Sequence, residues 1–429
     1  MAGTYLDLIS NALKINYSGN KILEMFDKDD VLADAFKKRV TGFDAKGLYF
    51  YEIYQKTRPQ GFAFVSGERS QIPTAGYSAY EDWQVSVKHL LGSFKIYGFA
   101  AKTATGNDKG SIINATVRDF QGVAKEAMYF LGLMLRGDGS GKLAEIASAS
   151  NTDGTYALLT ISDGETMAGI REGMYIDIYR DGSLVTYGSK HLVTAVNSAT
   201  TFTIARADVN AATFTAATIA AGDIVVRYGE YGIVPVGLGV RGIGDPATYS
   251  AILDNTGTFQ EIVRASTLAF QAIRIDGSDL TRFPDGADVD AAHLDALVDD
   301  IKATGLINKV DCFVMTLAAR RNYCNEASAS RRFIGDMTLD NGTRCKTHDE
   351  IPIIADNKWQ PGFIAGLNWT NLFRCYVGDE AISWEDFGTG ATFQRSADGT
   401  NSKEAVLSFD GNFGSRAPRH NGVLYSMNQ

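Results

Sequence analysis

Cysteine, proline and positive charge are all scarce in this sequence of 429 residues. The four cysteines include no Cys-x-x-Cys pair and are too few for a fold held by disulfides. Lysine and arginine number 41 against 50 aspartates and glutamates, and the net charge of −9 excludes the basic footprint of a sequence-reading nucleic-acid protein. The eight prolines stand beside 44 glycines, so the chain has many bends and few rigid loop ends.

Membrane spans and secretion signals are also missing. The strongest apolar run, Ala127–Leu135, is far shorter than the ~20 residues that cross a bilayer. The first residues, Met1–Asp7, lack the basic and apolar regions of a signal peptide. We therefore expect synthesis in a cytoplasm and no membrane partner.

What is present is the composition of a globular protein, with 45% hydrophobic residues. The length predicts two or three packed units. Residues 4–40 carry apolar side chains at helical spacing and predict a short helical arm. From residue 48 to 105 apolar and polar residues alternate, which predicts strands, among them Phe62–Val65 and Trp83–Val87 with a long polar tip between them. Such a hairpin has no core of its own.

The clearest predicted element is a helix over Ile113–Arg136, followed by Gly137 as its stop. One face carries apolar residues at a period near 3.6, including Val117, Phe120, Ala124 and Leu131. The second half is apolar nearly all round, which indicates a helix that is covered on several sides.

The remaining two thirds divide at a change of composition. Residues 151–232 contain short alternating runs separated by Asp-Gly turns, which predicts an inserted β-rich barrel or sandwich. From residue 233 helices and strands mix without a βαβ rhythm, so we expect an α+β body. Its predicted helices are Asp290–Ala303, with Asp288 as N-cap, and Leu317–Ala327.

Several motifs of binding sites occur in incomplete form. Gly237–Gly242 matches G-x-G-x-x-G, but Pro246 follows where a dinucleotide site needs a helix. Gly137–Lys142 looks like a phosphate loop, but it follows its helix and lacks the hydroxyl residue after the lysine. Asp285, Asp288 and Asp290 approach the spacing of a calcium loop without its glycine or closing glutamate, and helix capping explains them better.

Cys345-Lys-Thr-His348 has the spacing of half a zinc site, which Cys312 and Cys324 would have to complete from a distance. Buried, unreactive cysteines explain this pattern better. The five histidines have no catalytic context, and we predict no catalytic, cofactor-binding or metal residue and no enzyme activity. The densest basic cluster consists of Arg320, Arg321, Arg331 and Arg332. It is consistent with contacts to phosphate or to a neighbouring subunit, and equally with a solvated helix face.

The order of these elements resembles the major capsid proteins of tailed double-stranded DNA bacteriophages. Val65–Pro73 resembles that family's extended loop, and Ile113–Arg136 with the glycine turn after it resembles the spine helix. Leu317–Arg321, Ile351–Asp356 and Pro361–Ile364 resemble the axial domain and its return strands. The resemblance spans about residues 60–145 and 245–429, and the segment 151–232 resembles the β-rich insertion that some members carry.

The resemblance implies an α+β capsid fold with an all-β insertion, divided into six parts. These are an N-terminal arm (1–45), an extended-loop hairpin with flanking strands (46–105), a spine helix and peripheral domain (106–150), the insertion (151–232), an axial domain (233–375) and C-terminal strands that return to the peripheral domain (376–429). It also implies assembly contacts through the loop residues Glu68, Arg69, Gln71, Ile72 and Pro73.

The function implied is that of a virion component. Copies would assemble as pentamers and hexamers into an icosahedral shell around packaged double-stranded DNA, within a bacterial host cytoplasm. The implied partners are the chain itself, scaffolding and portal proteins, and decoration proteins, with no cofactor. Net negative charge suits a container that holds DNA without clamping it.

Three alternatives stay open at this stage. An encapsulin nanocompartment has the same fold and differs in its contents, an enzyme cargo instead of nucleic acid. A nucleotide-dependent enzyme would use Gly237–Gly242. A β-rich fibre or adhesin module would account for 151–232 but leaves the helix Ile113–Arg136 unexplained.

Overall fold

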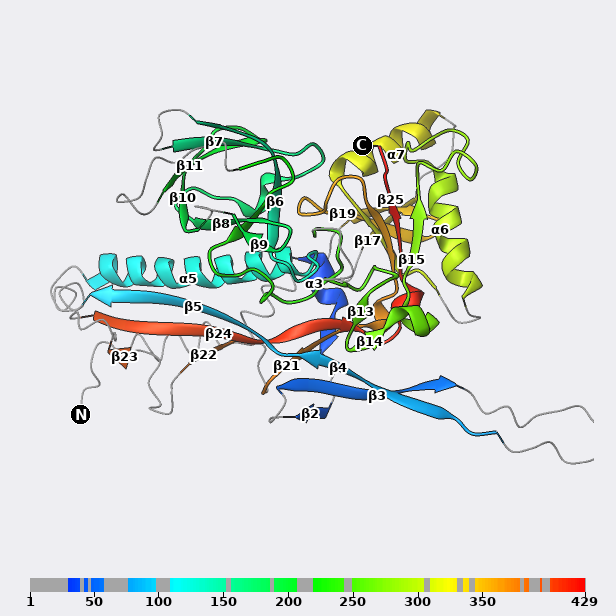
Figure 1. Ribbon diagram of the computed structural model, residues 1–429, viewed down its shortest axis with the longest axis horizontal. Helices are drawn as coiled ribbons and strands as arrows, with labels where there is room; N and C mark the ends of the chain where they lie inside the picture. The colour runs from blue at the N-terminus through cyan, green and yellow to red at the C-terminus, as the bar shows by residue number, and fades with distance from the viewer. Residues whose placement is uncertain are drawn as a thin grey trace, which may run out of the picture.

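The computed structural model shows an elongated body from which a hairpin projects (Figure 1). It describes residues 30–38, 42–44, 48–57, 76–97, 109–151, 156–185, 189–206, 219–242, 249–304, 309–329, 335–338, 344–378, 382–385, 394–395 and 402–428. The predicted helices before residue 30, the predicted strand Phe62–Val65 and the loop residues Glu68 to Pro73 lie outside these ranges.

A long helix on a long two-stranded ribbon forms one layer of the body (Figure 1). Helix α5 spans Lys109–Met134 and lies along strand β5 (Lys88–Tyr97), which pairs antiparallel with β24 (Ser402–Ser415). Alternating residues put one face of the ribbon under the helix. The rest of this sheet consists of β1 (Lys37–Lys38), β21 (Leu372–Tyr376), β22 (Ile382–Trp384) and β23 (Gln394–Arg395).

The projecting hairpin is a three-stranded ribbon in the order β2 (Gly42–Asp44), β3 (Tyr49–Thr57), β4 (Ala79–Ser86). The strand that pairs with β4 is β3, which lies within the alternating region predicted from residue 48. Helix α3 (Val31–Ala35) lies beside the body, and the Asp30 side chain caps it by accepting from Leu32 N.

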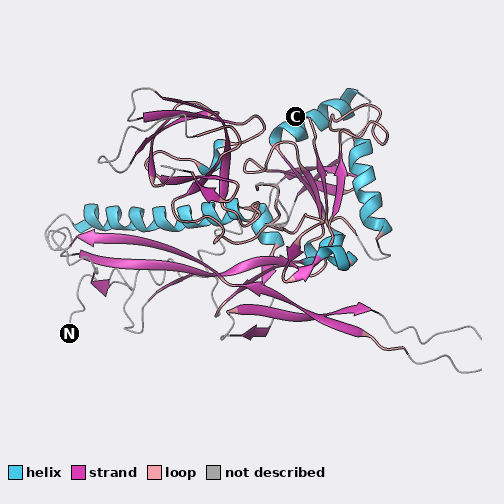
Figure 2. Cartoon of the chain, in the orientation of Figure 1, coloured by secondary structure: helices cyan, strands magenta, loops and turns pink. Residues whose placement is uncertain are grey.

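Seven strands between α5 and residue 227 form a separate barrel above the helix (Figures 1 and 2). Their order is β10 (His191–Val196), β11 (Thr201–Arg206), β7 (Tyr156–Ile161), β6 (Lys142–Asn151), β12 (Ile224–Arg227), β8 (Tyr175–Arg180), β9 (Ser183–Leu184). The β10–β8 pairing closes six of these strands into a ring, and β9 pairs with the remaining part of β8. The expected β-rich insertion is thus present, and its first strand, β6, begins at Lys142.

The remaining unit is a mixed sheet with two helices (Figure 2). Its strand order is β15 (Ile273–Asp276), β25 (Gly422–Tyr425), β20 (Ile364–Leu367), β16 (Cys312–Met315), β19 (Ile351–Ala355), β18 (Arg344–His348), β17 (Gly335–Thr338). Helix α6 (Ala291–Ala303) packs on β25 and β15, and α7 (Leu317–Ala329) contacts β19. This arrangement confirms the expected α+β class.

Short elements complete the fold: strands β13 (Thr258–Phe259) and β14 (Ile262–Val263), and the 3-10 helices Met167–Gly169, Arg264–Ser266, Leu268–Phe270, Trp369–Asn371 and Pro418–His420. The prediction of Asp288 as the cap of α6 is wrong. Asp290 is the N-cap, because its carboxylate accepts from the backbone N–H of His293. Among the described residues, no helix combines the length and hydropathy of a membrane span.

Candidate functional site

The hairpin of β3 and β4 is fixed to the body by one of its two faces. Alternation along the strands buries Phe50, Trp83 and Val85 on that face. Trp83 is 1% exposed and stacks on Phe373 of β21 with ring centroids 5.1 Å apart. Tyr54 reaches Phe270 at 5.1 Å. Burial of these large rings makes the base of the hairpin part of the main core.

Polar contacts lock the same base in register. Arg416, directly after β24, binds both carboxylate oxygens of Glu52, with an Nε–Oε2 distance of 2.9 Å. The backbone N–H of Gln84 donates to the carbonyl of Gln260, and Asn412 Nδ2 donates to the carbonyl of Ser86. The hairpin therefore leaves the body in one defined direction.

The opposite face of the hairpin is open to solvent and carries large apolar side chains among the polar Gln55, Asp82 and Gln84. Tyr51 and Ile53 of β3 are 42% and 65% exposed, and Tyr80 of β4 is 66% exposed. Tyr77, just before β4, is 90% exposed. Because these side chains gather on one face of one ribbon, they form an exposed apolar surface of the kind that marks an interaction site. We call Tyr51, Ile53 and Tyr80 the open face.

Helix α5 is covered on two sides in its second half, as predicted. Ala124 and Leu131 pack in the main core above the ribbon, whereas Phe130 and Leu133 pack in the barrel core. Tyr129 stacks under the guanidinium of Arg171 at 4.2 Å, which adds a barrel contact. The side chains of Val117 and Phe120, predicted on the same face, lie outside the described residues.

Arg136, at the end of α5, is the centre of a buried ion cluster. Its guanidinium binds Asp30 through both terminal nitrogens, at 2.7 and 2.8 Å, and Asp356 through Nε at 2.6 Å. Lys358 Nζ lies 3.2 Å from Asp30. Burial raises the pKa of Asp30, but Arg136 and Lys358 outweigh it and hold that pKa below its usual value. The cluster joins α3, α5 and the end of β19.

The two glycine motifs lie against each other where the chain enters and leaves the barrel. The N–H of Gly237 donates to the carbonyl of Gly137, and Arg241 N–H donates to the carbonyl of Arg136. A Cβ at Gly237 would clash with the carbonyl oxygen of Leu135, so glycine is required there by close backbone approach. The third glycine of the motif, Gly242, sits against the carboxylate of Asp138, which opposes phosphate binding.

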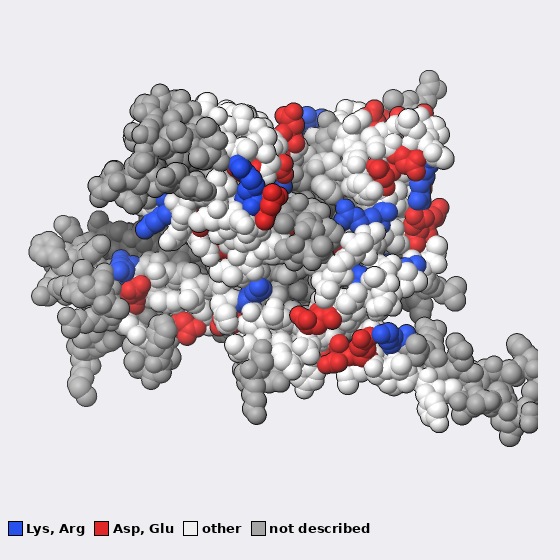
Figure 3. Space-filling view, in the orientation of Figure 1, with Lys and Arg blue, Asp and Glu red and all other residues white. Residues whose placement is uncertain are grey.

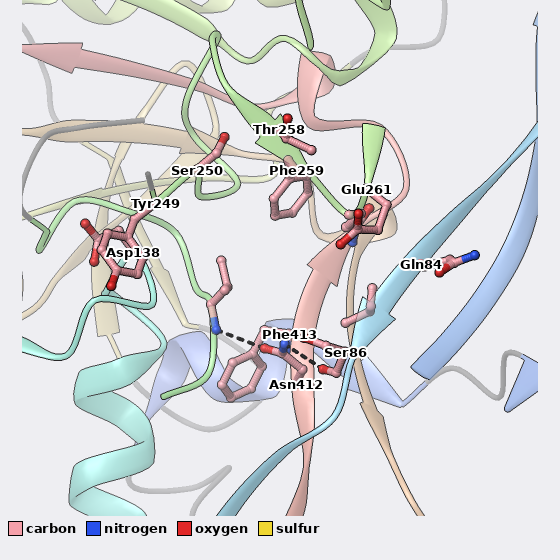
Figure 4. Close-up of a pocket in the computed structure, with 13 residues that line it drawn as sticks. Gln84, Ser86, Asp138, Tyr249, Ser250, Thr258, Phe259, Glu261, Asn412 and Phe413 are labelled. Atoms are coloured by element: carbon pink, nitrogen blue, oxygen red, sulfur yellow. Dashed lines mark hydrogen bonds between the residues drawn. The ribbon is translucent and has the colours of Figure 1, made fainter. Parts of the chain in front are cut away.

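A cavity of about 180 Å³ lies between the hairpin base, β24 and the β13–β14 turn (Figure 4). Asn412 bridges its wall by accepting from Val236 N–H and donating to Ser86 (Figure 4). Its charged lining residues are Asp138 and Glu261, and the lining contains no histidine, cysteine, lysine or arginine. This set offers neither a nucleophile–base pair nor a cation for phosphate.

The predicted arginine cluster is only partly described. Arg320 is half-buried and Arg321 is exposed on α7, while Arg331 and Arg332 lie outside the described residues. Among the described residues on the face drawn in Figure 3, basic and acidic groups are interspersed, and the basic ones form no continuous stripe of the kind that binds nucleic acid.

Sequence reasoning missed Asp30 and Asp356 as partners of Arg136, and it missed the open face. The sequence did carry a signal for the open face. Tyr51 and Ile53 are two residues apart and so lie on one side of a strand, opposite Tyr54, which makes both sides of the strand apolar; one side of such a ribbon is usually polar. No local signal marks the ion cluster, since its members are 106 and 220 residues apart.

Comparisons with known proteins give matches among solved structures only. No protein-family model matches the chain, and no curated protein matches it. The capsid asymmetric unit of cyanophage A-1(L) matches over 93% of both chains, with 11% identity and a TM-score of 0.47. The capsid of cyanophage P-SCSP1u matches over 93% of this chain and 89% of its own, with 9% identity and a TM-score of 0.43.

An encapsulin complex from Synechococcus elongatus matches less of the chain. That match covers 40% of this chain and 56% of the encapsulin chain, with 12% identity and a TM-score of 0.29. The two cyanophage capsids, in contrast, each match over more than nine tenths of this chain.

Proposed function

We propose that this chain is a structural shell protein, a major capsid protein that assembles with copies of itself into a closed icosahedral particle. The observation that carries the proposal is the open face, which belongs to a hairpin that is fixed at its base and projects beyond its own body (Figure 1). The role of such a protein is mechanical.

The hairpin is incomplete without a partner. A two-stranded ribbon is marginal in water unless one face is covered, and here the covered face ends at the base. Among the described residues no strand pairs with the outer edge of β4, whose backbone is tied to the body at Gln84 and Ser86. The large apolar side chains of the open face suit an extended contact with another protein surface.

A second copy of the chain is the partner that suits this geometry. A projecting element that meets a different surface on the next copy makes a heterologous contact, and repetition of such a contact closes rings. Rings of five and six subunits then close into a shell around double-stranded DNA. Scaffolding, portal and decoration proteins are the further partners that this function implies, and assembly would take place in the cytoplasm of a bacterial host.

Electron microscopy and sedimentation of the purified full chain test the proposal. We expect the wild type to form uniform closed particles. The triple variant Tyr51→Thr, Ile53→Thr, Tyr80→Thr keeps residues suited to strands and removes the open face, so it should stay folded and sediment as monomers or small oligomers. Folding is checked by circular dichroism and tryptophan fluorescence.

The matched control is the double variant Gln55→Thr, Gln84→Thr, which alters the same face of the same strands without removing apolar surface. It should assemble like the wild type. Normal particles from the triple variant would show that the open face is not an assembly contact. A wild type that stays monomeric at high concentration would refute the shell function itself.

A further inference from the structure

A histidine and two carboxylates meet on the mixed sheet, far in sequence from the hairpin. His348 ends β18, Asp349 follows it in the turn to β19, and Asp295 comes from α6. One ligand atom from each of the three lies within 4.8 Å of the others. Neither the open face nor the shell function uses these side chains.

His348 is held in a single orientation by its surroundings. The ring is 8% exposed and lies between the rings of Phe313 and Tyr323, with centroids 6.0 and 5.8 Å away. The Tyr323 hydroxyl lies 2.8 Å from Nδ1, which leaves Nε2 directed at Asp295, 2.8 Å from its Oδ1. A hydrogen bond at one ring nitrogen that aims the other at a group of carboxylates is the arrangement found around metal-bound histidines.

The two carboxylates approach the imidazole from different elements. The pairing of His348 with Ile351 closes a two-residue turn, in which Asp349 has φ of 47° and Glu350 has φ of 67°. This turn places Asp349 directly beside the imidazole. The Asp295 side chain is 53% exposed and therefore has room to rotate about its own bonds.

We propose that His348, Asp295 and Asp349 bind one divalent transition-metal ion of the borderline class, represented by Zn²⁺. Imidazole nitrogen and carboxylate oxygen are ligands that Zn²⁺ accepts, and three protein ligands leave a fourth position for water. In a tetrahedral site the ligand atoms are about 3.4 Å apart. His348 Nε2 and Asp295 Oδ1 are 2.8 Å apart and all three ligand atoms lie within 4.8 Å, so rotations of the exposed Asp295 and Asp349 side chains can reach that spacing.

The sequence had pointed to His348 with different partners. Cys345 packs in the main core, as does Cys312, so the cysteines of the half-site face apolar side chains instead of the histidine. Burial also raises the pKa of the Cys312 thiol, which opposes the thiolate that zinc requires. The donor set that the fold assembles is therefore nitrogen and oxygen.

Titration of the metal-free full chain with Zn²⁺, in competition with a chromophoric chelator, tests the proposal. We expect one Zn²⁺ per chain, and a d–d spectrum of a four-coordinate site when Co²⁺ replaces it. Asp295→Asn and Asp349→Asn should each lower the affinity at least tenfold. Both variants should fold, because Asp295 is exposed and asparagine tolerates the left-handed backbone at position 349.

Tyr323→Phe tests the positioning of the imidazole. It keeps all three ligands and removes the hydroxyl at Nδ1, so Zn²⁺ affinity should fall about 10- to 100-fold. A purely structural role for Tyr323 would change thermal stability without this loss. Asp299→Asn, an exposed acid one turn along α6, is the control and should bind Zn²⁺ like the wild type.

Two results would overturn the proposal. One is the absence of stoichiometric Zn²⁺ binding by the wild type. The other is binding that Asp295→Asn and Asp349→Asn leave unchanged, which would locate the ion elsewhere and reduce the cluster to an ion pair between His348 and Asp295. Neither measurement depends on particle formation, so a failure of the metal-site proposal can be told apart from a failure of the proposed shell function.

Discussion

Replacing Arg136 with methionine should destabilise the folded chain by about 3–5 kcal/mol, the usual cost of removing one partner from a buried ion pair. The guanidinium is 2% exposed and neutralises two carboxylates that are themselves 3% and 8% exposed, those of Asp30 and Asp356. Methionine restores much of the side-chain volume and none of the charge. Lys358 still reaches Asp30, which keeps the loss toward the lower end of that range.

The pH dependence has a definite sign. In the wild type the pKa of Asp30 is held below its ordinary value, so its contribution to stability is present above about pH 4 and is lost as the pH falls through the folded-state pKa. Without Arg136, burial outweighs the remaining attraction and the pKa of Asp30 rises. The variant is therefore stabilised when Asp30 takes up a proton. The difference in free energy of unfolding between wild type and variant should become smaller as the pH falls from 7 to 4.

Urea unfolding of the dilute, unassembled chain, followed by tryptophan fluorescence, measures both effects. The triple variant Arg136→Met, Asp30→Asn, Asp356→Asn supplies the control, because removal of the charges together costs much less than removal of the cation alone. A loss below 1 kcal/mol for the single variant, or a difference that widens on acidification, would refute the assignment of a charged, buried cluster.

Two further predictions concern the junction with the barrel. Gly237→Ala should prevent folding or strongly lower the midpoint of thermal unfolding, because the added Cβ meets the carbonyl of Leu135. Gly122→Ala, on the open side of α5, should be neutral or stabilise the chain by up to about 1 kcal/mol. Equal effects of the two variants on thermal unfolding would contradict this prediction. Burial raises the pKa of Glu230 to about 7, so the free energy of unfolding should fall as the pH rises from 4.5 to 7. Glu230→Gln should remove this pH dependence and stabilise the chain at pH 8 by at most about 3 kcal/mol. An unchanged pH dependence in the variant would contradict the prediction.

Local periodicity was sufficient to predict α5, α6 and α7 and the strands of the barrel. It was wrong at Lys37–Lys38, which form strand β1 inside the predicted helical arm. Helix α5 ends at Met134, two residues before the predicted Arg136, and Gly137 does not have the left-handed backbone of a glycine stop. The Asp181-Gly182 turn separates β8 from β9, as predicted. These are short-range properties, which a sequence displays directly.

The contacts between distant segments were not accessible in the same way. Strand β24 extends over all of Ser402–Ser415 because it pairs with β5 along one part and with β21 along the other. The length and register of β24 therefore depend on three segments together, β5, β21 and β24 itself. The domain boundaries and the loop residues Glu68 to Pro73 stay predictions.

The pairing of β5 with β24 also determines when the protein can finish folding. His89 and Asp410 are opposite each other in this ladder although 321 residues separate them. The strand beneath α5 therefore finds its partner only after β24 has been synthesised, whereas the barrel strands all lie within residues 142 to 227 and can fold earlier. Until β24 arrives, the underside of α5 is exposed apolar surface, so the pairing with β24 ends the risk of aggregation there.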